Sequence, residues 1–309
     1  MTNESQNQDT VSSGNTSGVH RLAAVAEVIF VRFVIYALIA LGLLQLVYGS
    51  PSPEPFPMEA SYLIGSLWFV IPAVGIYGLR RNPEKYGLSI KDGKQSVDLA
   101  LNAFPYYVIT NVGFMLLIVM GWSYLGPLGA MILTTFFAVA LWLIVELIVR
   151  KYSSFEDVQI PQRKHRNNVI AILLLLLLPI GLGVILGRLS LLLVSTVVWQ
   201  FVFSGFGEEI FFRGYIQSRL NLAFGRPYEW KGIHFGAGLF ITAAIFAITH
   251  MMNTGNIWLG DFNLAWWWGT FTFVGGILFG LLREKTGSIV APGTLHGLEA
   301  VGEGLALLF

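Results

Sequence analysis

The sequence contains no cysteine, so it forms no disulfide and offers no thiolate as a nucleophile or metal ligand. Charged residues are also scarce, at 12% of the 309 residues, against roughly 25% in a typical soluble domain. A net charge of +1 does not favour a nucleic-acid partner, which needs a strongly basic surface. With 55% hydrophobic residues, the composition is typical of a membrane protein whose partner is the lipid bilayer.

The first 19 residues are rich in Ser, Thr, Asn, Gln and Gly and have almost no apolar content. Such a segment buries too little apolar surface to offset the entropy lost on ordering, so residues 1–19 are expected to be a disordered tail. The tail lacks the apolar core that follows a basic start in a signal peptide. Residues 20–309 are expected to form a single transmembrane bundle.

Apolar runs long enough to cross a bilayer, which takes about 20 residues, recur along the chain. The candidates are Ala23–Tyr48, Tyr62–Leu79, Leu99–Met120, Met131–Val149, Val169–Leu186, Leu189–Phe206 with its continuation, Gly238–Met252, Leu264–Leu282 and Ile289–Phe309. The count is eight to nine, because the seventh run is short and only Gly187 and Arg188 separate the fifth from the sixth. The sequence therefore predicts an all-α fold, a polytopic transmembrane helix bundle.

Lysine and arginine residues gather on alternate connections between these runs. Most lie in loops 80–98, 150–167 and 213–234, whereas loops 49–61, 121–130 and 253–263 hold none. Cytoplasmic loops collect positive charge, so the N-terminus is expected in the cytoplasm and the C-terminus outside. The basic loop after residue 150 separates N-terminal spans, residues 20–150, from a C-terminal part, residues 168–309.

Two adjacent carboxylates and an arginine stand near the end of the sixth run: Glu208, Glu209 and Arg213. Charge is costly in hydrocarbon and usually faces a protein interior or a water-filled cavity. On a helix, Glu209 and Arg213 are four residues apart and can form an ion pair, while Glu208 lies about 100° around the axis and stays free. One paired and one free carboxylate indicate a functional site.

Four other charged residues in the apolar runs have structural interpretations. Glu27 and Arg32 lie close to the start of the first span and are expected to reach the inner membrane interface. Glu146 and Arg150 are four apart at an inner helix end and are expected to form a snorkelling pair. None of the four is assigned to the site.

Two histidines, His250 and His296, lie in later runs. Each alone could be hydrogen-bonded between helices, but with a free glutamate they indicate convergence, since scattered ionisable groups in a bundle are costly. Convergent Glu and His side chains can activate water, one accepting its proton and the others stabilising the oxyanion. These residue types also bind zinc, although the metalloprotease pattern of two histidines four apart around a glutamate is absent from the sequence.

Three motifs resemble those of the CPBP family of intramembrane metalloproteases, which includes CAAX prenyl endopeptidases and Abi-like bacterial relatives linked to bacteriocin processing or self-immunity. They are Glu208-Glu209-x-x-x-Arg213, Phe246-x-x-x-His250 and Gly287-Ser288-Ile289-x-x-Pro292-x-x-x-His296. The resemblance covers the C-terminal part and leaves the first four spans outside. It implies a glutamate-dependent endopeptidase in the plasma membrane of a prokaryote, acting on a membrane-associated protein or peptide.

Carried over by position, the resemblance implies that Glu208 is the general base on water. His250 would help to hold that water and His296 would stabilise the oxyanion, with Glu209 and Arg213 in supporting roles. A zinc ion bound by Glu208, His250 and His296 is an alternative, but a metal-free site without a cofactor is the preferred interpretation.

The chain departs from the family at Ala300, where an asparagine commonly supplies a second oxyanion donor. Removing one such donor lowers the rate by about 100- to 1,000-fold. Asn253, three residues after His250, and Glu299, on the helix face of His296, are candidates to compensate. Ala300 leaves open a non-catalytic immunity or scaffold protein that retains the protease fold. A solute transporter is less favoured, since the sequence shows no internal repeat.

The charge distribution predicts which loops a membrane-impermeant reagent can reach. The chain has no cysteine, so a single cysteine introduced at position 91 or 164 is the sole labelling site. Neither is expected to react with an external maleimide in intact cells, because both lie in loops expected in the cytoplasm. A cysteine in loop 253–263 serves as the labelled control. Clear labelling at 91 or 164 would overturn the orientation.

Overall fold

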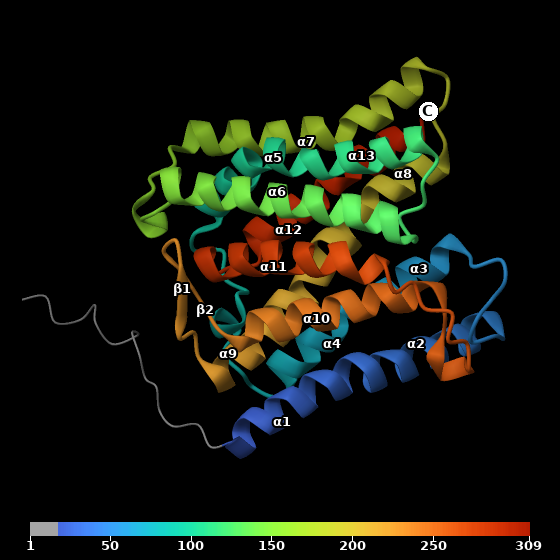
Figure 1. Ribbon diagram of the computed structural model, residues 1–309, viewed down its shortest axis with the longest axis horizontal. Coiled ribbons are helices and arrows are strands. Elements are labelled where there is room, and N and C mark those ends of the chain that lie inside the picture. The colour runs from blue at the N-terminus through green and yellow to red at the C-terminus, as the bar shows by residue number, and fades with distance from the viewer. Residues whose placement is uncertain (1–17) are drawn as a thin grey trace, which may run out of the picture.

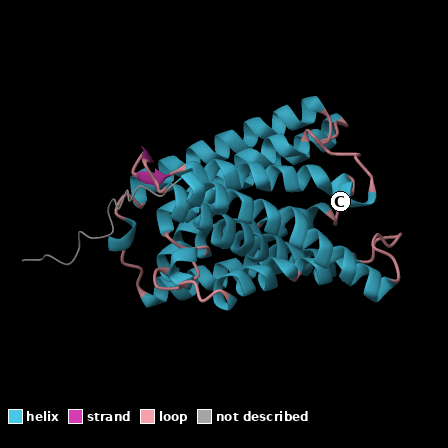
Figure 2. Ribbon diagram, turned by 90° about the horizontal axis from the view of Figure 1, so that it is seen from below, coloured by secondary structure: helices cyan, strands magenta, loops and turns pink. Residues whose placement is uncertain are grey.

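Helices make up nearly all of the computed structural model, which describes residues 18–309 (Figures 1 and 2). The first half contains α1 (Gly18–Ile29), η1 (Phe30–Ile35), α2 (Tyr36–Tyr48), α3 (Met58–Gly65), α4 (Leu67–Ala73), η2 (Val74–Gly78), η3 (Pro83–Tyr86), α5 (Gly93–Met120), α6 (Pro127–Lys151), η4 (Phe155–Asp157) and α7 (Gln162–Ile185). The second half contains α8 (Leu191–Val198), η5 (Trp199–Gly207), η6 (Ile210–Gln217), α9 (Ser218–Phe224), β1 (Tyr228–Trp230), β2 (Ile233–Phe235), α10 (Ala237–Met251), η7 (Met252–Thr254), η8 (Ile257–Leu259), α11 (Trp268–Thr286), α12 (Val290–Gly297) and α13 (Glu299–Ala306). The predicted all-α fold is confirmed.

One short antiparallel hairpin, β1–β2, departs from the all-helical prediction and lies at one end of the bundle (Figure 2). Its strands are joined by Lys231 and Gly232, which both have positive φ, as a two-residue hairpin turn requires. The start of α1 lies at the same end, and the C-terminus lies at the opposite end (Figure 1). Of the predicted tail, residues 1–17 lie outside the described part, and residues 18 and 19 belong to α1.

Seven helical segments within residues 18–309 are long and apolar enough to cross a membrane by length and composition. They are Gly18–Tyr48, Met58–Gly78, Gly93–Met120, Pro127–Lys151, Gln162–Ile185, Leu191–Phe224 and Ala237–Thr254. The eighth predicted span corresponds to α11, which ends in the charged residues Arg283, Glu284 and Lys285. The ninth is divided at Leu298 into α12 and α13. The predicted count of eight to nine is therefore approximately met.

Two apolar clusters hold these helices together. One joins α5, α6, α11 and α12 and includes Leu99, Phe137 and Leu295. The other joins α1, α4, η6 and α10 and includes Phe212 and Phe246. Burial of such side chains stabilises by about 1.5–3 kcal/mol each in water, but within lipid the equivalent contribution comes from close packing. The segments that carry Glu209 and His296 thus belong to different clusters and meet where the clusters adjoin.

Glycines allow η5 and α12 to cross in direct backbone contact. A Cβ atom on Gly205 would lie 2.5 Å from the Cα of Gly297, and one on Gly297 would lie 2.7 Å from the ring of Phe201. Small residues of this kind let helices approach closely in membranes. This crossing brings the helix that carries His296 against the helix that carries both glutamates.

A buried carboxylate ties α5 to the neighbouring helices. Asp98 is 2% exposed and accepts hydrogen bonds from the Tyr152 hydroxyl at 2.8 Å and from Asn168 Nδ2 at 2.7 Å. Its other partner is Lys164, whose Nζ lies 2.8 Å from Asp98 Oδ1. The charge is therefore fully compensated, as a buried carboxylate requires.

One of the structural interpretations for charged residues, the pairing of Glu146 with Arg150, needs correction. Glu146 forms an ion pair with Lys231 of the hairpin turn, and Arg150 has no ion pair among residues 18–309, so the predicted Glu146–Arg150 pair is wrong. The turn between β1 and β2 returns to α6, which sequence spacing does not reveal. Glu27 lies between α1 and α9, where Arg219 Nε donates to its carboxylate at 2.7 Å.

Candidate active site

The two glutamates lie within one long helical segment, Leu191–Phe224. On both sides of them the backbone has wider π-helical turns, η5 and η6. Such turns are rare and occur frequently at functional sites. Glu208 is 7% exposed and Glu209 is fully buried, so the structure places two adjacent carboxylates inside the bundle.

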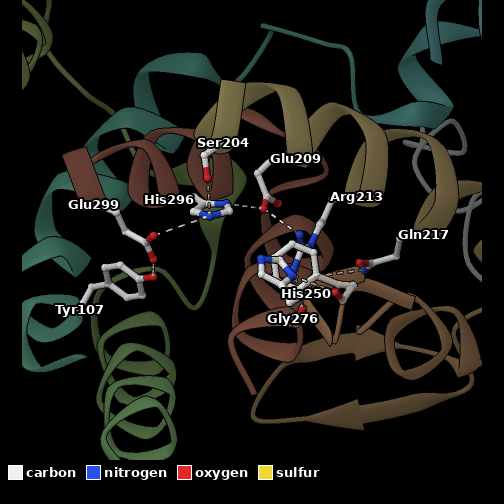
Figure 3. A network of polar contacts seen from close by, with 11 residues as sticks. Tyr107, Ser204, Glu209, Arg213, Gln217, His250, Gly276, His296 and Glu299 are labelled. Atoms are coloured by element: carbon white, nitrogen blue, oxygen red, sulfur yellow. Dashed lines mark hydrogen bonds and ion pairs between the residues drawn. The ribbon is translucent and has the colours of Figure 1, made fainter. Parts of the chain in front are cut away.

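A single carboxylate oxygen of Glu209 contacts both an arginine and a histidine (Figure 3). Arg213 Nη1 donates to Glu209 Oε1 at 2.8 Å, within a pair whose side chains are both fully buried. His296 Nδ1 lies 2.9 Å from the same oxygen. Arg213 also donates from Nη2 to the carbonyl of Gly276 at 3.2 Å. The ion pair expected from the four-residue spacing is present, and Glu209 additionally anchors a histidine from α12.

His296 is fixed on both sides of its ring. A carboxylate only accepts, so the nitrogen facing Glu209, Nδ1, carries a proton. The other nitrogen, Nε2, lies 3.5 Å from Ser204 Oγ and 3.9 Å from Glu299 Oε2. The ring stacks on Phe279, with centroids 4.5 Å apart and an interplanar angle of 15°. The ring is therefore held by Glu209 and Phe279, and Nε2 is the nitrogen that does not contact Glu209.

His250 is held from within its own helix, α10. Its Nδ1 lies 2.9 Å from the carbonyl oxygen of Phe246, and a carbonyl only accepts, so Nδ1 is protonated and a neutral ring keeps an acceptor at Nε2. The ring of Phe246 lies 4.4 Å from that of His250 and 6.3 Å from that of His296. Phe246 therefore makes ring contacts with both imidazoles.

Glu208 differs from its neighbour in having no partner. It forms no hydrogen bond or ion pair within residues 18–309, and its Oε2 is buried without one. The charged groups that act on it most strongly are His296, Glu209 and Arg213. His296 also interacts electrostatically with His250. Glu208 and His250 are thus each within electrostatic reach of His296, and the convergence of all three on one cavity stays a prediction.

The two residues considered as replacements for the missing asparagine lie in different places. Asn253 is exposed in η7 and has no hydrogen bond. Glu299 lies beside His296 and accepts a hydrogen bond from the Tyr107 hydroxyl (Figure 3). Ala300 itself is fully buried. Only Glu299 is therefore in contact with the site.

Sequence reasoning missed three residues at this site. Ser204 and Tyr107 contact His296 and Glu299 as described, but neither a serine nor a tyrosine in an apolar run carries a signal that separates it from packing residues. Arg32 was assigned to the inner interface, yet it is 8% exposed and its Nε donates to Thr249 Oγ1 at 3.0 Å. The interface interpretation of Arg32 is wrong, because its side chain turns inward toward α10.

The residues of the site do not fit a zinc ion in this conformation. Glu208, His250 and His296 have the donor atoms that zinc prefers. Among residues 18–309, however, no three such side chains lie close enough to share one metal ion.

Comparison with protein families supports the resemblance drawn from the motifs. Residues 190–301 match the family described as type II CAAX prenyl endopeptidase Rce1-like. The match begins at α8, ends within α13 and includes Glu208, His250 and His296, whereas Arg32 and Tyr107 lie outside it. Comparison with curated proteins and with solved structures found no match.

The Glu209–Arg213 pair can be tested by thermal unfolding of purified variants. Arg213→Met should lower stability by about 3–5 kcal/mol, because it leaves a lone buried carboxylate. Adding Glu209→Leu removes both charges and should restore most of that stability. Arg150→Met, at an exposed arginine without an ion pair, is the control and should change little. A double variant as unstable as Arg213→Met would contradict the assigned charge compensation.

Proposed function

We propose, on the match of residues 190–301 to the Rce1-like type II CAAX prenyl endopeptidase family, that the protein is an intramembrane endopeptidase whose attacking water is activated by Glu208. Its substrate is a membrane-associated protein or peptide, and its location is the plasma membrane of a prokaryote, with the N-terminus in the cytoplasm. One observation supports the proposed mechanism: Glu208 is a buried carboxylate without a partner among residues 18–309, next to Glu209, whose Oε1 is bound by both Arg213 and His296.

The first step is proton transfer from water to Glu208. The carboxylate accepts a proton as the water oxygen bonds to the carbonyl carbon of the scissile peptide, and the carbonyl oxygen becomes an oxyanion. His250 Nε2 can accept the second hydrogen of the water, because Nδ1 of that ring donates to Phe246. Collapse of the tetrahedral intermediate breaks the C–N bond, and Glu208 returns its proton to the leaving amine.

The oxyanion is stabilised from the side of His296. A protonated ring would donate from Nε2, while Nδ1 remains bonded to Glu209, which supplies the counter-charge. Ser204 Oγ, 3.5 Å from Nε2, is the neutral donor nearest to that position. Preorganised donors aimed at a developing charge commonly make the largest single contribution to such catalysis. His296 and Ser204 thus offer two donors although position 300 is an alanine.

The base can be tested with a pair of isosteric substitutions. Glu208→Gln keeps the shape of the side chain and removes the base, so cleavage of a membrane-embedded reporter peptide should fall by about 100-fold or more, with thermal stability retained. Glu303→Gln, at an exposed glutamate on α13, should cleave at nearly the parental rate, and His296→Ala should lose more activity than Glu303→Ala. If Glu208→Gln cleaves as fast as the parent, Glu208 is not the base.

A metal-free mechanism makes a separate prediction. Prolonged treatment of the purified protein with 1,10-phenanthroline, followed by its removal, is expected to leave the cleavage rate unchanged, because no metal takes part in the proposed proton transfer. The non-chelating isomer 1,7-phenanthroline is the control for direct inhibition. Loss of activity with the first compound alone, restored by added zinc, would show that the site works with a bound metal.

A further inference from the structure

Arg32 is a buried cation without a carboxylate partner. It lies in η1, outside the matched residues, and is 8% exposed. No Asp or Glu oxygen within residues 18–309 forms an ion pair with it, in contrast to Arg213, which is paired with Glu209. Arginine in a membrane-spanning helix is expensive and is normally paired or functional. No carboxylate of the described chain lies within ion-pairing distance of Arg32, so an anionic ligand would complete its pairing.

The guanidinium of Arg32 is fixed at one end and open at the other. Nε donates to Thr249 Oγ1 at 3.0 Å, and the group lies over the ring of Tyr36, with Cζ 4.8 Å from the centroid. Its two terminal nitrogens have no hydrogen bond. Arg213 Nε also has no hydrogen-bond partner but is buried, whereas the terminal nitrogens of Arg32 reach accessible space. The planar fork is therefore oriented and available.

The open end of Arg32 belongs to the candidate active site. Thr249, which holds it, precedes His250 in α10. The charge of Arg32 acts on His250 and interacts with that of Glu208, yet no ion pair joins Arg32 to Glu208. Glu208 thus stays free of an ion pair with Arg32, and the terminal nitrogens of the guanidinium stay available beside Thr249.

We propose that Arg32 binds a carboxylate of the substrate close to the cleaved bond, either the C-terminal carboxylate or an Asp or Glu side chain. Guanidinium forms two parallel hydrogen bonds with a carboxylate, a geometry that adds specificity as well as energy. Peptide carbonyl oxygens can also accept from a guanidinium, but among the groups of such a substrate only a carboxylate also supplies the negative charge that a buried cation lacks. This inference rests on the proposed function, because it assigns a substrate group to the same site, and it makes Arg32 a specificity-determining residue contributed by the first helix.

Binding is measured without cleavage by using three short probes. They are acetyl-trileucine with a free carboxylate, its C-terminal amide, and an acetylated Leu-Glu-Leu amide that carries the carboxylate on a side chain. The free acid or the side-chain acid should raise the melting temperature of the detergent-purified protein, and the neutral amide should not. The acid that raises the melting temperature shows whether Arg32 binds a C-terminal carboxylate or a side-chain carboxylate.

Variants show whether Arg32 is responsible. Arg32→Gln should weaken binding of the active acid by about tenfold or more, since a charge-assisted hydrogen bond is lost, and Arg32→Lys should keep part of it. Arg150→Gln, at an exposed arginine, is the matched control. Equal stabilisation by the acids and the amide, or full binding by Arg32→Gln, would overturn the proposal. If Arg32→Gln does not fold, Thr249→Val replaces it, since losing the acceptor for Nε should also weaken binding of the acid.

A cleavage assay separates this inference from the proposed function. With a cleavable peptide carrying the favoured carboxylate, Arg32→Gln should raise KM and leave kcat nearly unchanged, whereas the amidated peptide should show no such difference. A parent protein that binds the acid through Arg32 but cleaves neither peptide would contradict the proposed function alone. A parent that cleaves both peptides equally well would contradict the role of Arg32 alone.

Discussion

One carboxylate oxygen, Oε1 of Glu209, is the contact on which the rest of the site depends. It accepts a hydrogen bond from Arg213 on its own helix and another from His296 on α12. In a region of low dielectric constant these interactions are strong, and losing the carboxylate would leave an arginine and a histidine uncompensated. Because Glu209 is occupied in this way, the adjacent Glu208 is the carboxylate left free for chemistry.

The helices outside the matched residues shape the surroundings of that chemistry. Tyr107 of α5 donates to Glu299, which borders His296, and Arg32 of η1 faces the site from the side of α10. The matched residues therefore hold the candidate base and both histidines, whereas polar side chains around them also come from the first spans. A family comparison confined to residues 190–301 cannot reveal these contributions.

Sequence reasoning succeeded where a contact is local or a pattern is long. Apolar runs predicted the helices, and the four-residue spacing predicted the Glu209–Arg213 pair. The contact between His296 and Glu209 was not foreseen, because it depends on a helix crossing made possible by glycines far apart in the chain. The inward turn of Arg32 was missed for a related reason. Hydropathy indicates where along a span a charged residue lies, but not which side of the helix its side chain faces.

The position of Asp98 has a consequence for how the chain is made. Its partners Tyr152, Lys164 and Asn168 all precede residue 190, so this carboxylate can be neutralised while the ribosome is still translating the segment with the two glutamates. Glu209, in contrast, must wait for His296, near the end of the chain. The contacts of Asp98 can thus form during membrane insertion, whereas the contact between Glu209 and His296 forms only when synthesis is almost complete.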